Sequence, residues 1–209
     1  MNPTYIFLAD GFEEVEALAT LDVMRRGGMN VITVSINSDK NVTGAHGVTV
    51  VADALLDEVS MASEPEFLVL PGGMPGAANL AACEKVCEML KEQNDRGGKI
   101  AAICASPSLV LFPNGILNGR EATCYPGMEP DGAEMIGEPV VMSENVITGM
   151  GPAWSFAFGL AILAASKGEN VAEAVAQGML LRESSFWLDS KVVFLKKIRC
   201  EVMNMDFFS

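Results

Sequence analysis

Short apolar runs alternate with amphipathic stretches along most of the chain, and this alternation predicts its architecture. The apolar runs are rich in β-branched residues, which is typical of buried strands in a parallel sheet. The stretches between them have the length and periodicity of helices. The predicted strands are 4–8, 30–36, 48–52, 67–70, 99–103, 122–125, 140–142 and 146–148, and the predicted helices are 13–26, 84–95, 153–166 and 171–180.

The helix predicted after the first strand carries apolar residues at helical spacing and ends at a glycine pair, Gly27-Gly28. We expect its buried face to consist of Val15, Leu18, Leu21 and Met24.

Strands that alternate with helices predict an α/β fold, a three-layer sandwich with helices on both faces of a doubly wound, mostly parallel sheet of the flavodoxin-like type. In such sheets the functional crevice lies at the carboxyl ends of the strands. Three of the predicted strands end abruptly in a loop, and these strand ends lie at Asp10-Gly11, Gly72-Gly73 and Cys104. We therefore expect these three loops to meet.

Cys104 stands at the abrupt end of the strand predicted over 99–103. Ser106-Pro107 then indicates a helix start, with Ser as N-cap and Pro at the first helical position. Only Cys104 and Ala105 connect strand and helix, so the chain is expected to turn sharply there as a nucleophile elbow. The positive end of that helix favours the thiolate over the thiol. A buried, inert cysteine is the alternative interpretation.

We predict one α/β domain over residues 1–181 and a partly ordered extension over 182–209, where aromatic and basic residues accumulate. The 209 residues carry a formal net charge of −13, which argues against nucleic acid as a partner. The uncharged stretch 145–166 is broken at Gly151-Pro152 and leaves a helix too short for a bilayer, so no membrane partner is expected.

The chain contains five cysteines, an odd number without disulfide-like spacing, and it begins without a basic signal-peptide region. Both features favour a reducing, cytoplasmic location. Cys83 and Cys87 are spaced for one helical face, but neither a histidine nor a second cysteine pair completes a metal site. No metal is therefore expected.

The chain resembles the ThiJ/PfpI superfamily, and within it the branch of the Parkinson's-disease-associated protein deglycase. The resemblance extends from about Tyr5 to Leu181. It rests on four motifs in order: Asp-Gly-Phe-Glu-Glu-Val-Glu at 10–16, Leu-Pro-Gly-Gly-Met-Pro-Gly-Ala at 70–77, Ala-Ala-Ile-Cys-Ala-Ser-Pro at 101–107, and Gly151-Pro152 followed by Ser155-Phe156. It implies a class I glutamine amidotransferase-like fold, a homodimer with the first helix near the interface, and no cofactor.

The resemblance also implies a site. Cys104 falls at the reactive cysteine and Glu16 at its paired glutamate, while backbone amides of Gly72, Gly73 and Ala105 are expected to face the sulfur and a developing oxyanion. Repulsion between an ionised Glu16 and an ionised Cys104 raises the pKa values of both groups, whereas a protonated Glu16 donates a hydrogen bond to the Cys104 thiolate. On that basis we expect a lowered pKa for Cys104. The alternative for Glu16 is a solvated acid in the first turn of a helix.

The sequence departs from the family pattern at four positions. Ala105 stands where peptidase and amidase members carry a histidine, which disfavours a Cys-His hydrolase. Tyr125 replaces a frequent histidine, Met150 replaces a frequent arginine, and the single histidine, His46, falls near another frequent arginine. We assign Tyr125, His46 and Met150 to a secondary pocket, with an ordinary loop histidine as the alternative for His46.

The function that the resemblance implies is cysteine-dependent, cofactor-free handling of reactive dicarbonyls, as in glyoxalase III or a protein deglycase. The substrate is then methylglyoxal or an early glycation adduct on a protein, and Glu16 moves the proton that rearranges the Cys104 hemithioacetal. The alternative is a redox-sensing stress-response protein or chaperone that acts through oxidation of Cys104. A cysteine peptidase or amidase is a lesser alternative. The family also carries the historical label thiazole monophosphate biosynthesis. The glycine-rich segment 72–76 lacks the Lys-Ser/Thr pair of a phosphate-binding loop and gives this label no support.

Overall fold

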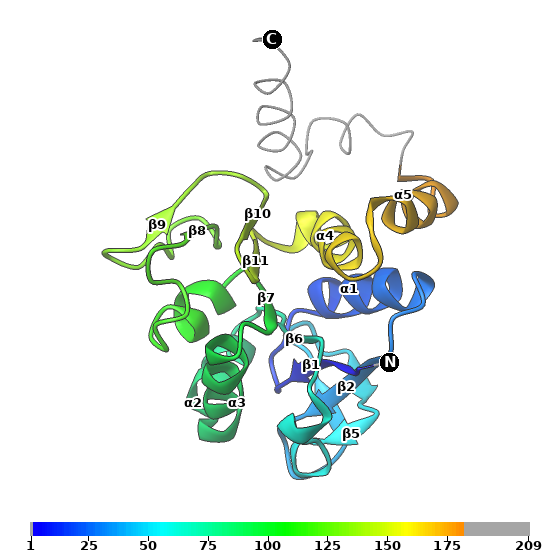
Figure 1. Cartoon of the computed structure of the whole chain (residues 1–209). Helices are drawn as coiled ribbons and strands as arrows, with labels where there is room; N and C mark the ends of the chain where they lie inside the picture. The colour runs from blue at the N-terminus through cyan, green and yellow to red at the C-terminus, as the bar shows by residue number, and fades with distance from the viewer. Residues whose placement is uncertain (1, 182–209) are drawn as a thin grey trace.

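The computed structural model describes residues 2–181, in which helices cover both faces of a central sheet (Figure 1). The strand order is β10-β11-β7-β6-β1-β2-β5, and neighbouring strands are parallel except for the β10–β11 hairpin. This is the predicted three-layer, mostly parallel α/β fold. The strands are β1 (Thr4–Leu8), β2 (Val31–Ser35), β5 (Ala54–Leu55), β6 (Phe67–Leu70), β7 (Lys99–Ile103), β10 (Val140–Ser143) and β11 (Val146–Gly149).

The helices form two layers around this sheet. Helices α1, α4 and α5 lie on one side and α2 and α3 on the other (Figure 1). Two small two-stranded sheets, β3–β4 and β8–β9, lie outside the central one. The helices are α1 (Glu14–Arg26), α2 (Gly76–Ala82), α3 (Glu84–Asp95), α4 (Ser155–Lys167) and α5 (Glu169–Gly178). The strands of the two small sheets are β3 (Asn41–Thr43), β4 (Thr49–Val51), β8 (Glu121–Ala122) and β9 (Glu134–Met135). Short 3₁₀ turns span Leu56–Glu58, Met61–Ser63 and Pro152–Trp154.

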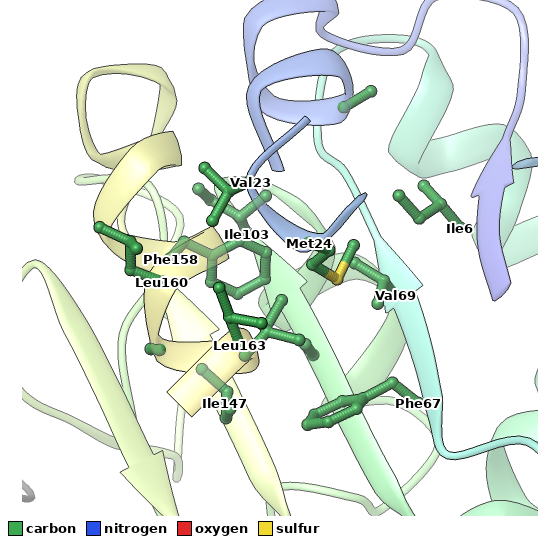
Figure 2. Close-up of a cluster of buried hydrophobic side chains, with 14 of the residues drawn as sticks. Ile6, Val23, Met24, Phe67, Val69, Ile103, Ile147, Phe158, Leu160 and Leu163 are labelled. Carbon is green, nitrogen blue, oxygen red and sulfur yellow. The ribbon is translucent and has the colours of Figure 1, made fainter. Parts of the chain in front are cut away.

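The central strands are buried on both faces, and their side chains alternate between two cores. In β1, Ile6 and Leu8 join the core under α1 and α4, whereas Tyr5 and Phe7 join the core under α2 and α3. Figure 2 shows the first core, in which Phe158 of α4 lies close to the sheet residue Ile103. This two-sided burial explains why the strands appear in the sequence as continuous apolar runs.

The face that α1 buries agrees with the predicted one only in part. Met24 is buried and Leu21 packs against the core, as predicted. Val15 and Leu18 are instead exposed by 50% and 37%, and Glu16, Thr20 and Val23 are buried. The reason is the close approach of α4, where a Cβ on Gly159 would lie 3.1 Å from the Val23 Cβ. Gly159 lets the two backbones approach closely at Thr20 and Val23, and the α1 surface that faces away from this crossing carries Val15 and Leu18.

Three further predictions need correction. Of the strand predicted at 122–125, only Ala122 is extended, as the end of β8, which pairs with β9 outside the central sheet. Helix α2 was not predicted, because its Gly-Ala-Ala-Asn sequence shows no amphipathic pattern. Ser106 does not cap a helix: its backbone is already helical, its hydroxyl donates to the Pro71 carbonyl at 2.6 Å, and a π-helical segment follows at Pro107–Leu111. The predicted 182–209 extension lies outside the described residues.

Candidate active site

Cys104 occupies the turn between β7 and the π-helical segment, in a left-handed backbone conformation with φ of 64°. A non-glycine residue in this region costs about 1–2 kcal/mol. Two hydrogen bonds hold the turn: the Cys104 N–H donates to the Gly149 carbonyl at 2.8 Å, and the Tyr125 N–H donates to the Cys104 carbonyl at 2.9 Å. The predicted nucleophile elbow is therefore present, at the carboxyl end of the sheet.

Two backbone amides act on the sulfur of Cys104. Hydrogen bonds from the N–H groups of Gly73 and Ala105 favour its ionised form. The Gly72 amide contributes no such bond, because it donates at 2.7 Å to Oε2 of Glu16. The prediction that Gly72 faces the sulfur is therefore wrong, since its amide positions the carboxyl group instead.

Two glycines are required where the loops meet. A Cβ on Gly72 would lie 2.6 Å from the Cys104 Cβ and 2.8 Å from Glu16 Oε2. Gly73 has φ of 88°, and a Cβ there would lie 2.4 Å from the Glu13 backbone nitrogen. The loop after β6 thus packs directly on the elbow and on the start of α1, which brings the three predicted breaks together.

Glu16 projects from the first turn of α1 into the interior and is 1% exposed. Burial raises its pKa to about 7, an effect that hydrogen bonds from Cys104 and the Gly72 amide oppose and that the charge of Glu13 reinforces. Its second oxygen, Oε1, is buried and receives no hydrogen bond from nitrogen or oxygen groups of residues 2–181. This oxygen is the natural position for a proton.

The pKa of Cys104 is raised to about 12, first by burial and then by the charge of Glu16 and its hydrogen bond; the amides of Gly73 and Ala105 oppose the shift. This direction is opposite to the expected lowering. Cys104 is 8% exposed, and its sulfur faces a carboxyl group that is ionised at high pH, so a second negative charge is costly there. Between pH values of about 7 and 12 the pair therefore holds one proton and one negative charge.

Sequence reasoning missed the roles of Glu13 and Glu14. Oε2 of Glu13 accepts the Glu16 N–H at 2.6 Å and caps α1. Glu14 accepts the His46 N–H and contacts His46 Nδ1, both at 2.7 Å, which fixes the β3–β4 turn to the start of α1. The only sequence signal was their place in the Asp-Gly-Phe-Glu-Glu-Val-Glu motif.

His46 therefore pairs with Glu14 rather than with Cys104. This hydrogen bond and the charge of Glu14 raise the pKa of His46. The ligand atoms of Glu13, Glu14 and His46 lie within 4.8 Å of one another, a spacing compatible with a metal ion. These atoms already have hydrogen-bond partners, however. Oε2 of Glu14 contacts His46 Nδ1, Oε1 of Glu14 accepts backbone amides of the hairpin, and Oε2 of Glu13 caps the helix. The cluster is therefore accounted for by these hydrogen bonds.

The other residues assigned to a secondary pocket flank the elbow. Tyr125 is 47% exposed, and its ring lies 3.5 Å from the position that a Cβ on Gly151 would take. Met150 is partly buried and directly follows Gly149, whose carbonyl accepts the Cys104 N–H. Both residues are thus next to the nucleophile, on the side opposite the Gly72-Gly73 loop.

The profile of the DJ-1/PfpI family matches residues 3–165. The chain belongs to this family. It is 36% identical to the Parkinson disease protein 7 homolog of Danio rerio over 185 residues, which cover 85% of this chain and 96% of that protein. It is 35% identical over 173 residues to a Caenorhabditis elegans protein named glutathione-independent glyoxalase DJR-1.2, covering 81% and 90% of the two chains.

Solved structures of the family share the fold of this chain. The structure of Toxoplasma gondii DJ-1, oxidized, superimposes with a TM-score of 0.81 at 31% identity and covers 86% of this chain and 98% of its own. Two Arabidopsis thaliana relatives, DJ-1 homologs B and A, are 41% and 36% identical, but the matched region spans only 36% and 45% of their lengths. Among helices within residues 2–181, none has the length and apolar character needed to cross a membrane.

Proposed function

We propose that this DJ-1/PfpI family member is a cofactor-free enzyme that converts reactive dicarbonyls such as methylglyoxal through Cys104 and Glu16. The observation that carries the proposal is the placement of Cys104 at a left-handed turn beside the buried carboxyl group of Glu16, which the Gly72 amide holds in position. The naming of the Caenorhabditis elegans relative as a glutathione-independent glyoxalase supports it.

The position of the shared proton decides whether Cys104 is reactive. With the proton on Oε1 of Glu16, the negative charge resides on the sulfur and receives hydrogen bonds from Gly73, Ala105 and the carboxyl group. With the proton on sulfur, the charge resides on a carboxylate that the Gly72 amide stabilises. The two forms differ by one proton transfer over a short distance, so the thiolate is accessible without a separate base.

In the proposed reaction, the Cys104 thiolate adds to the aldehyde carbon of methylglyoxal and the carbonyl oxygen takes the Glu16 proton. The resulting Glu16 carboxylate then removes the hydrogen of the former aldehyde carbon, and the electron pair moves to form an enediol. The Glu16 carboxyl group then returns this proton to the neighbouring carbon, while the hydroxyl proton moves to the former ketone oxygen, which gives a lactoyl thioester of Cys104. Water hydrolyses this thioester to lactate. One proton of the water goes to Glu16 and the other to solvent, which restores the pair with one proton and one negative charge. The Gly73 and Ala105 amides are placed to stabilise the oxyanions of the addition and hydrolysis steps.

The test is lactate formation from methylglyoxal by the wild type and by Cys104→Ser and Cys104→Ala. We expect both variants to lose essentially all turnover. A matched control is Cys83→Ser, because Cys83 is a free cysteine on the α2–α3 junction, away from the elbow. Full activity of Cys104→Ala rules out the mechanism, and an equal loss in Cys83→Ser shows that the effect is structural.

A second candidate function is redox sensing by the same sulfur. The unpartnered Oε1 of Glu16 is buried beside Cys104, where a protonated carboxyl group can donate to an oxygen bonded to sulfur. Two equivalents of peroxide would oxidise the thiolate to a sulfinate and release two waters. Intact-mass measurement after mild peroxide should then show selective addition of two oxygens at Cys104. Prior oxidation of Cys83 or Cys87 removes the basis of this candidate.

The cysteine peptidase or amidase is not proposed further. Its mechanism needs an imidazole base next to the sulfur. The chain has one histidine, and this residue pairs with Glu14 at the start of α1.

A further inference from the structure

The loops around the Cys104 turn are acidic. They comprise residues 10–16, 43–49, 71–77, 104–107, 123–128 and 149–152, and they contain no lysine or arginine. They contribute instead four carboxyl groups, those of Asp10, Glu13, Glu14 and Glu16. The one basic side chain in these loops, His46, is engaged by Glu14. An anionic substrate that approaches the sulfur thus meets negative charge from these loops, and none of them supplies a lysine or arginine to pair with it.

Two exposed, largely apolar side chains belong to the loops that contact the Cys104 turn. Tyr125 is anchored through its backbone N–H to the Cys104 carbonyl, and its ring is half exposed beside Gly151. Met74 is 55% exposed and directly follows Gly73, whose amide donates to the sulfur. An exposed aromatic ring and an exposed thioether on the loops that contact a nucleophile favour contact with an apolar or aromatic substituent.

We propose that the site selects uncharged 2-oxoaldehydes with an apolar or aromatic substituent, discriminates against carbonyl compounds that carry a carboxylate, and uses Tyr125 as the wall that contacts the substituent. This inference rests on the proposed dicarbonyl chemistry for its substrates. It goes beyond that function by assigning the class of substituent and the residue that recognises it.

Discrimination by charge is tested with two substrates that share one reactive group. 4,5-Dioxopentanoate and its methyl ester carry the same 2-oxoaldehyde and differ in the charge at the other end. We expect kcat/KM for the ester to exceed that for the acid by about tenfold at low ionic strength, and this ratio should fall as salt screens the carboxylates. Equal kcat/KM values for acid and ester overturn the proposal.

Recognition by the aromatic wall is tested with phenylglyoxal and methylglyoxal. Tyr125→Ala should lower kcat/KM for phenylglyoxal about five- to tenfold more than for methylglyoxal, because only the larger substituent reaches the ring. Tyr125→Phe keeps the ring and should keep the preference. A distant control is Leu180→Ala, at a 73% exposed site after α5. If the two Tyr125 variants show the same selectivity as the wild type, the wall has been wrongly assigned.

Alkylation of Cys104 separates this inference from the proposed function, since it needs no turnover. Iodoacetamide and iodoacetate are similar in size and differ in charge. Peptide mass mapping gives the rate at which each reagent modifies Cys104, and hence the ratio of the iodoacetamide rate to the iodoacetate rate. We expect this ratio to be about tenfold greater for Cys104 than for a small free thiol such as 2-mercaptoethanol. A protein that shows this ratio but no lactate formation retains the selectivity and refutes only the enzymatic function. A ratio equal to that of the free thiol overturns the selectivity, whether or not the protein turns over methylglyoxal.

Discussion

The buried carboxyl group of Glu16 links the stability of the fold to pH. Its pKa rises from an ordinary value of 4.5 to about 7 on folding, so the folded state favours the protonated form. The contribution of this group to stability is complete below pH 4.5 and is lost as pH rises to about 7. We therefore predict that the free energy of unfolding of the wild type falls, relative to Glu16→Gln, by up to about 3 kcal/mol over this range.

Urea unfolding of both proteins at pH 5 and pH 8 measures this difference. Comparison with Glu16→Gln removes the contributions of the other carboxyl groups, which are the same in both proteins. Asp53 is one of them: burial raises its pKa, but hydrogen bonds from Thr33 and the charge of Arg25 outweigh burial and lower it. A difference between the two proteins that does not change with pH contradicts the assignment of Glu16 as a group protonated by burial.

The loop glycine Gly73 offers a second prediction with a matched control. Gly73 and Gly127 have nearly the same φ, 88° and 86°, but a Cβ on Gly73 would lie 2.4 Å from backbone atoms, whereas nothing lies within 4 Å of one on Gly127. Gly127→Ala should cost about 1 kcal/mol, the left-handed strain alone. Gly73→Ala should cost at least about 3 kcal/mol, because strain and overpacking add.

Unfolding in urea gives both values, and the difference between them isolates the packing of the loop against the start of α1. Equal costs for the two substitutions would show that the loop can move away from Glu13 without penalty.

The sequence was sufficient to predict which residues meet at the site, but not how each is used. Cys104, Glu16 and the glycine pair follow from the resemblance to the family, and the sharp turn follows from the two residues between strand and helix. Which amide points at the sulfur depends on the left-handed conformation of Gly73, and no pattern distinguishes it from Gly72. The direction of the Cys104 pKa shift depends on burial depth, which the sequence does not show either.

At the level of secondary structure, the sequence was most informative where glycine pairs separate elements. Helix α3 and strand β7 agree with their predicted bounds, since Gly97-Gly98 divides them clearly. Half of the predicted buried face of α1 is wrong, because Val15 and Leu18 are exposed while Met24 and Leu21 pack into the core as predicted. In the structure, Thr20 and Val23 meet Gly159 of α4, and the acidic Glu16 is buried near Cys104.

The crossing of α1 and α4 gives a prediction about packing. A Cβ on Gly159 would lie 3.1–3.3 Å from Val23 and Thr20, which is tight but tolerable, whereas a leucine there would push the helices apart. We predict that Gly159→Leu destabilises the fold by about 3 kcal/mol or more, despite the better helix propensity of leucine. Gly178→Leu, at the end of α5 where nothing lies within 4 Å, should stay within about 1 kcal/mol of the wild type.

Thermal and urea unfolding of the two leucine variants measure the effect. Since Glu16 lies on α1, Gly159→Leu should also lower dicarbonyl turnover at temperatures where the protein remains folded. If Gly159→Leu is as stable and active as Gly178→Leu, the close crossing of the helices is not what positions Glu16.

On the scale of the whole molecule, an apolar surface crosses two elements that are distant in sequence. Val15 and Leu18 of α1 are exposed, and so are Val48 and Val51 of the β3–β4 hairpin. The two elements are joined where the hairpin amides donate to Glu14, the residue before Val15. An exposed apolar surface shared by two elements is typical of a protein interface, and a second copy of this chain is the partner that we predict for it.

We predict that the wild type is a dimer at micromolar concentration and that the double substitution Val15→Glu with Leu18→Glu gives a folded monomer. Each glutamate places an uncompensated charge in the apolar contact, and two copies of each meet across a two-fold axis, so the cost is doubled. Leu180→Glu is the matched control, because Leu180 is more exposed than either residue but lies beyond α5. Sedimentation velocity reports the mass, and circular dichroism confirms that the variants are folded. A wild-type monomer, or a double variant that remains dimeric, would show that this apolar surface serves another purpose.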